Sequence, residues 1–203
     1  MIKTFTLALT CCLASLLVSG CGGSVERVDP DETIDLSGEW NDTDSRMVAE
    51  EMIADSLSRP WATDFIAGNQ GKKPVVRVAP QDVRIRTNGD TISKEVFLND
   101  LRRSFINSGR VRVVSTAGEA SATRAELADQ QEHASEASRK EQKQELGADF
   151  ILHGEINVQD DVKGRKRLRF YSVDLMLTNV QTREQVWIGN KKLKKLVTGA
   201  STR

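Results

Sequence analysis

The middle of this chain alternates between stretches with the apolar spacing of a helix and stretches with that of a strand. A helix is predicted over residues 45–58, where Val48, Met52 and Leu57 fall on one stripe, with Asp42, Thr43 and Asp44 as candidate N-caps. A short helical turn is expected at 61–66. Another helix follows Thr91 or Ser93 and stops at Ser108-Gly109. Trp40 and Trp61 flank the first helix and are expected in the core.

The strand-like stretches predict one mixed sheet. Residues 74–80 are β-branched and bounded by prolines, and 83–87 either prolong that strand or form an irregular extension. A second strand is predicted at 110–115. Residues 149–158, 168–177 and 184–193 form an antiparallel meander, with a hairpin loop at 160–166. The predicted fold class is α/β (α+β), a mixed β-sheet of about five strands with flanking helices.

Two polar stretches leave alternatives open. Residues 117–146 are rich in Ala and charge and favour one or two helices, either as a solvated face or as a docking surface; Ser138 and Glu141 have capping-box spacing. Residues 191–195 (KKLKK) form a basic patch. This patch either solvates an edge strand, which discourages aggregation, or touches anionic lipid or peptidoglycan.

The N-terminus has the order of features of a bacterial lipoprotein signal. Lys3 precedes an apolar run of 14 residues at 5–18, which is too short for a spanning helix of about 20. Val18-Ser19-Gly20-Cys21 then matches the lipobox pattern, in which small residues precede a Cys that becomes lipidated. We expect a signal peptide at 1–20 and lipid attachment at Cys21, as S-diacylglycerol and N-acyl groups. The other interpretation is an ordinary secretory signal or a buried Cys.

The remaining chain is divided by composition. Residues 21–36 are predicted to be the lipidated N-terminus and a short flexible tether, 37–197 the globular domain, and 198–203 a C-terminal tail. Cys11 and Cys12 leave with the signal, so the mature chain would hold no free thiol and no disulfide.

No pattern in the sequence indicates catalysis or a cofactor. His133 and His153 lie twenty residues apart, without the short spacing of a zinc pair, and His153 is expected to be a packed structural residue. There is no Gly-x-Ser-x-Gly elbow and no phosphate-binding Gly loop. The formal net charge is zero, with 29 basic and 29 acidic residues, so nucleic acid is not an expected partner. We expect no enzyme activity, no metal and no cofactor.

Several blocks in order along the chain resemble the LpoB-type penicillin-binding protein activators: 45–52 (SRMVAEEM), 59–61 (RPW), 73–76 (KPVV), 106–114 (INSGRVRVV), 146–150 (LGADF) and 186–189 (VWIG). The resemblance implies a fold similar to the N-terminal domain of TolB. It also implies an outer-membrane lipoprotein that binds the non-catalytic docking domain of a bifunctional class A penicillin-binding protein and activates it.

The resemblance also implies a location in the cell, and the chain differs from the enteric members in the length of its tether. Gly22, rather than Asp, follows Cys21, which by the enteric sorting rule implies the periplasmic face of the outer membrane. The enteric members have a long tether, whereas this one is short. The alternative function is a lipoprotein component of a curli-type secretion or envelope assembly complex, because residues 146–154 also resemble such proteins. We expect a monomer; a ring would favour the alternative.

Overall fold

The computed structural model describes residues 26–29, 32–35, 37–87, 91–135 and 145–199. The chain divides into two units, Met1–Glu32 and Thr33–Arg203. Within the described part of the first unit, the amide of Glu32 donates a hydrogen bond to the carbonyl of Asp29. The predicted signal peptide, Cys21 and the Ser138/Glu141 spacing lie outside the described residues. Among the residues described, none of the helices combines the length and apolar character needed to cross a membrane.

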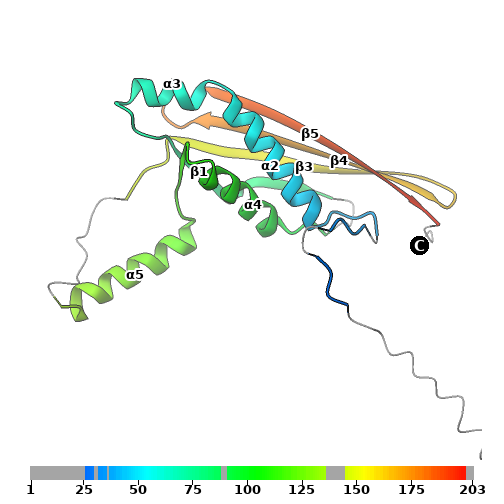
Figure 1. Ribbon diagram of the computed structural model, residues 1–203, viewed down its shortest axis with the longest axis horizontal. Coiled ribbons are helices and arrows are strands. Elements are labelled where there is room, and N and C mark those ends of the chain that lie inside the picture. Colours follow the sequence, from blue (N-terminus) through cyan, green and yellow to red (C-terminus); the bar gives the residue numbers. More distant parts are fainter. Residues whose placement is uncertain (1–25, 30–31, 36, 88–90, 136–144, 200–203) are drawn as a thin grey trace, which may run out of the picture. The chain divides into compact units, whose positions relative to one another are not determined.

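The second unit contains the predicted mixed sheet (Figure 1). Its five strands lie in the order β2-β1-β3-β4-β5, where β1 is Val75–Arg86, β2 Arg112–Val113, β3 Phe150–Lys163, β4 Lys166–Asn179 and β5 Gln185–Thr198. Strand β1 is parallel to β2 and β3, and the β3–β4–β5 meander is antiparallel. This arrangement confirms the predicted fold class.

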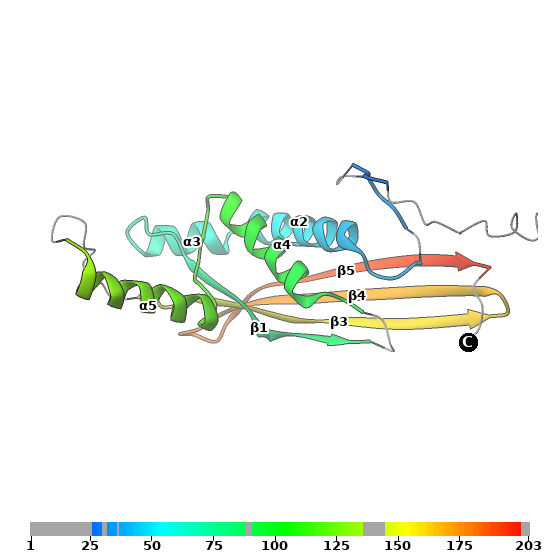
Figure 2. The same cartoon turned by 90° about the horizontal axis from the view of Figure 1, so that it is seen from below.

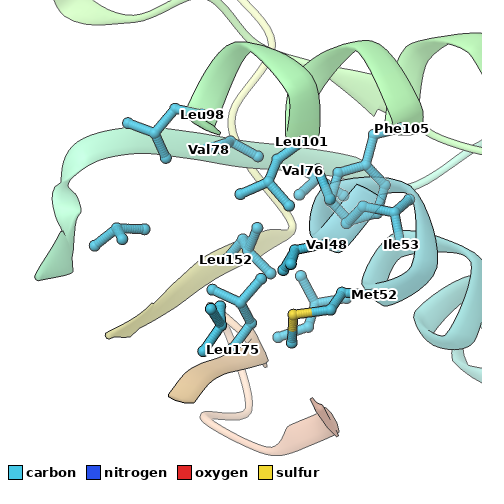
Figure 3. Packing of buried hydrophobic residues seen from close by; sticks show 14 of the residues in the cluster. Val48, Met52, Ile53, Val76, Val78, Leu98, Leu101, Phe105, Leu152 and Leu175 are labelled. Carbon is cyan, nitrogen blue, oxygen red and sulfur yellow. The ribbon is translucent and has the colours of Figure 1, made fainter. Parts of the chain in front are cut away.

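Helices α2 (Asp42–Ser58) and α4 (Lys94–Asn107) lie together on one face of the sheet (Figure 2). Side chains from both helices meet those of β1, β3 and β4 in a single apolar core, in which Val48, Leu101 and Leu175 are fully buried (Figure 3). Trp40 and Trp61 belong to the same core, as predicted. A short helix, α3 (Trp61–Gly68), follows α2, and its Trp61 ring packs on Phe150.

The cap of α2 differs from the prediction. The N-cap is Asn41, whose side chain accepts from the amide of Asp44, while the Asp44 carboxylate accepts from the amide of Asn41. This reciprocal capping box satisfies two backbone amides at once. Asp44 therefore acts as the third helical residue of the box and not as the cap.

The strands also differ in length from their predicted ranges. Strand β1 continues through Pro80 to Arg86, with a register shift between Val78 and Val83, because a proline without an N–H cannot continue the ladder. Strand β2 has only two residues, and just before it the Arg110 side chain donates hydrogen bonds to the Leu57 carbonyl on α2 and to the Thr63 hydroxyl on α3.

The hairpin loop predicted at 160–166 is wrong. Strand β3 runs to Lys163 and β4 starts at Lys166, so Asp160 and Asp161 belong to the ladder. The turn is only Gly164-Arg165, and Gly164 has φ +60, as the first position of a type II′ turn requires. Strand β5 extends to Thr198, five residues beyond its predicted end.

The polar segment after β2 contains one described helix, α5 (Ala117–His133). A capping box between Thr116 and Glu119 starts it, and this hydrogen bonding lowers the pKa of Glu119. None of its residues is buried. An ion pair joins it to a later segment, with Arg124 lying 2.5 Å from Glu145.

Candidate interaction surfaces

The two histidines lie on different elements, His153 on β3 and His133 on α5. His153 is half-buried on β3, and its Nε2 lies 2.9 Å from the Thr178 hydroxyl on β4, so it is a packed residue as predicted. His133 is exposed at the end of α5, 3.7 Å from Asp129. Over the ranges that the structure describes, no three His, Cys, Asp or Glu residues gather in a group that could hold a metal ion.

The face of the sheet away from α2 and α4 is half-exposed and carries polar side chains together with exposed apolar ones such as Ile188 and Leu196. Asp174 on β4 accepts a 2.6 Å hydrogen bond from the Asn190 side chain on β5, which also contacts Ser172. Arg86 on β1 lies 3.4 Å from Glu155 on β3. We call this the open face. Because side chains alternate along a strand, the same strands bury apolar residues beneath the helices and present these polar pairs on the open face.

Strand β5 forms one edge of the sheet, and its residue Trp187 contacts helix α2. The Trp187 indole N–H donates a 2.8 Å hydrogen bond to Asp55 on α2. This bond holds the pKa of Asp55 below its usual value, against an opposing effect of burial and with help from Arg59. A methyl group at Gly189 would lie 2.2 Å from the Trp187 ring, so glycine at this position lets the ring lie flat along the edge.

The basic patch on β5 divides between the two faces of the sheet. Lys191 and Lys195 point toward the helix side, where Lys191 pairs with Glu51. Lys192 and Lys194 are exposed on the open face, and the Lys194 ammonium lies 5.9 Å from the Phe170 ring centre. The edge position agrees with a role in solvating an edge strand. The sequence pattern did not reveal that Lys191 and Lys195 form ion pairs with acidic residues elsewhere in the fold.

The segment before α2 is fastened to the far ends of β4 and β5. Lys195 lies 2.6 Å from Asp35 and 2.6 Å from Asp44. Burial acts to lower the pKa of Lys195, yet the hydrogen bonds that its ammonium donates to Asp35 and Asp44 outweigh this effect, and the net shift is upward. Asp35 falls in the stretch 21–36 that was predicted to be a flexible tether. Because it pairs with Lys195, at least this residue of the stretch contacts the folded sheet.

Arg169 completes this attachment. Its side chain is 6% exposed and lies 3.3 Å from Glu39 and 3.2 Å from Asp160. Beside it, the Tyr171 hydroxyl donates to the Gly38 carbonyl, and Gly38, at φ +71, packs against Val197. We call these contacts the N-terminal clasp: Asp35, Gly38 and Glu39 on the segment, with Arg169, Lys195 and Val197 on the strands.

Comparison with known proteins identifies the family. The model of the peptidoglycan-synthase activator LpoB matches residues 44–193, which span almost all of the elements from α2 to β5. The chain belongs to the LpoB family. It is thus a member of a family of peptidoglycan-synthase activators, as the sequence resemblance predicted. Among curated proteins, none matches this chain.

Solved structures include two LpoB domains similar to this LpoB-family chain. The LpoB C-terminal domain of Escherichia coli is 20% identical, with a TM-score of 0.42, and that of Salmonella enterica is 20% identical, with a TM-score of 0.39. Each match covers 75% of this chain and 99% of the other. The lipoprotein GNA1162 of Neisseria meningitidis is 12% identical over 61% of this chain and 83% of its own, with a TM-score of 0.35.

Proposed function

We propose that this protein is a lipid-anchored activator of a bifunctional class A penicillin-binding protein. Cys21 carries the lipid at the periplasmic face of the outer membrane, and the folded unit binds the non-catalytic docking domain of the synthase. Binding stimulates glycan polymerisation and cross-linking. The observation that carries the proposal is the LpoB family match over residues 44–193.

The mechanism that we propose is a shift in the population of synthase states. A protein without catalytic groups of its own can accelerate an enzyme by binding its active conformation more tightly than its inactive one. The size of the activation is then limited by that difference in affinity. The described residues offer binding surfaces, namely the open face, the β5 edge and the helix side, and no metal-binding group.

The length of the tether sets a geometric condition. Twelve peptide units separate Cys21 from Thr33, where the second unit begins, so the lipid and the folded unit are at most about 40 Å apart. The docking domain of the synthase must therefore come close to the outer membrane. This expectation distinguishes the protein from the enteric members with long tethers.

The direct test is reconstitution. Residues 21–203 with Cys21→Ala are mixed with the class A synthase of the same organism, and glycan polymerisation and cross-linking are followed. We expect both rates to rise, and the protein alone to show no turnover on glycan substrates. A synthase lacking its docking domain is the control and should not respond. Absence of binding and of any rate change would contradict the proposal.

Two further measurements address anchoring and assembly. In cells, Cys21→Ala should release the domain into the periplasm and weaken function without unfolding it; full function would show that anchoring is incidental. Light scattering on the purified domain should give a monomer. A stable ring would instead favour the curli-type secretion function.

A further inference from the structure

The β3–β4 hairpin ends in a run of exposed charge. Residues 161–166 are all exposed, and Lys163, Arg165 and Lys166 lie at or beside the Gly164-Arg165 turn. Asp161 is the acid at this end of the open face, while Asp160 points to the other face, where it contacts Arg169. The hairpin end is therefore predominantly basic.

Strand β5 adds cations and apolar side chains to the same face. Opposed residues in a ladder share one face, and the register pairs Asp161 with Leu168, Leu168 with Leu196, and Phe170 with Lys194. Leu196 is 62% exposed. We define the basic tip as Lys163, Arg165, Lys166, Lys192 and Lys194 with Leu168, Phe170 and Leu196.

The basic tip and the N-terminal clasp, where the segment leading from the lipid joins the sheet, lie at the same end of β4 and β5 but on opposite faces. The N-terminal clasp fixes Asp35 to Lys195, between Lys194 and Leu196 in the sequence, and packs Gly38 against Val197. Strand β5 pairs there with the hairpin, since Arg167 is opposite Val197 and the Gly199 amide bonds to the Arg165 carbonyl. Figure 2 shows the ends of β3, β4 and β5 gathered at this end of the sheet.

We propose that the basic tip rests on the anionic phospholipid headgroups of the membrane that holds Cys21, an inference that rests on the lipid anchoring proposed above. Cations near an anionic surface are attracted with a strength that salt screens. Leu196 and Phe170 supply apolar groups at the depth of the headgroup boundary. The short tether keeps the local concentration of lipid high, so a weak individual contact suffices.

This contact orients the folded unit. The other end of the β3–β4 pair, where Phe150 is opposite Asn179 and packs against Trp61 of α3, points away from the membrane. That end, with the turn between β4 and β5, is thereby presented toward the cell wall. An acidic protein surface is the competing occupant of the basic tip, and the test separates the two.

The test measures vesicle binding by residues 21–203 carrying Cys21→Ala, which removes the lipid and leaves the tip as the source of binding. Cosedimentation is compared for vesicles of phosphatidylcholine alone and of phosphatidylcholine with phosphatidylglycerol, at low and high salt. We expect binding to the anionic vesicles only, lost at high salt. The triple change Lys163→Gln, Lys166→Gln and Lys194→Gln should weaken it by about tenfold or more.

The matched control removes the same charge elsewhere. Lys72→Gln, Lys73→Gln and Arg183→Gln alter three exposed cations away from the tip and should leave binding within about twofold. Leu196→Ser should weaken binding without a change in net charge. Equal binding to both vesicle types, no binding at low salt, or an equal loss in both triple variants would overturn the proposal.

Synthase stimulation in solution, without vesicles, separates this proposal from the proposed function. The basic-tip variant should stimulate the synthase like the parent and keep its thermal unfolding midpoint. If it loses stimulation while its vesicle binding is unchanged, the tip binds an acidic protein surface and the lipid proposal is wrong. If stimulation persists but no variant or parent binds anionic vesicles, only the lipid proposal fails.

Discussion

The meander of β3, β4 and β5 has two halves that are held to the rest of the molecule by different forces. In the half beneath α2 and α4, the inward positions of β4 are Val173, Leu175 and Leu177, all fully buried. Beyond Tyr171 the inward position is Arg169, and on the neighbouring strand it is Lys195. The first half is covered by helices, and the second is covered by the N-terminal clasp through ion pairs.

This difference follows from the length of the strands. Helix α2 begins at Asp42 near Trp40 and Tyr171, whose rings pack edge to face, and the strands continue beyond that point. The inward residues there lie beyond the start of α2, and Val197 among them packs against Gly38 instead. Charged inward residues paired with Asp35, Glu39 and Asp44 instead join the segment from the N-terminus to the sheet. The covered half supplies stability, and the clasped half fixes where the tether joins.

The largest effect is expected in the covered half. Leu175→Ala should lower the free energy of unfolding by about 3 kcal/mol, because the side chain is fully buried and leaves a cavity. Urea unfolding measures the change. The control is Leu196→Ala on the exposed end of β5, which should shift stability by about 0.5 kcal/mol or less. Equal losses at both positions would erase the distinction between the halves.

A smaller effect is expected in the clasped half. Lys195→Met should lower the free energy of unfolding by about 2 kcal/mol, because it leaves the buried Asp44 without its cation; the value is reduced because Lys195 is partly exposed. The folded state raises the pKa of Lys195, so this stabilisation is present below about pH 10.5 and disappears as the pH rises through the folded value.

The control for the clasp removes a lysine of the same strand that faces the other way. Lys192→Met on the open face should change stability by less than about 0.5 kcal/mol. If Lys195→Met is equally mild while amide exchange at residues 37–41 is unchanged, the clasp does not hold the N-terminal segment.

The covered half was predictable from the sequence, because helical and strand periods are local and apolar patterns report burial directly. The stripe of Val48, Met52 and Leu57 and the three antiparallel strands of the meander agree with the structure, whereas the ends of those strands do not. The clasped half was not predictable. Its pairs join residues such as Asp35 and Lys195, which lie 160 positions apart. From the sequence alone, charged residues of this kind are predicted to lie on the surface or in a tether.

The basic patch on β5 could likewise be predicted only in part from the sequence. The basic patch was visible, but its division between ion pairs and the open face depends on which residues face the helices, and a one-residue shift in register would reverse it. The predicted loop at 160–166 hid the continuation of the ladder, because Asp and Gly are typical of turns. The lipid site at Cys21 rests on the sequence pattern and stays a prediction.

The smallest effect is expected at the β5 edge, where the bond from Trp187 to Asp55 joins the covered half of the meander to α2. Asp55→Asn should lower stability by less than about 1 kcal/mol at neutral pH, because the carboxylate is substantially exposed. The folded state lowers the pKa of Asp55, so the carboxylate stabilises the fold above its unfolded pKa near 3.8 and ceases to do so as the pH falls through the folded value. The difference between parent and variant in urea unfolding should therefore shrink from pH 7 toward pH 3.

Trp187→Phe removes the donor, and in that background Asp55→Asn should have a weaker pH dependence. An unchanged pH dependence would mean that Arg59, and not the edge tryptophan, holds the carboxylate ionised.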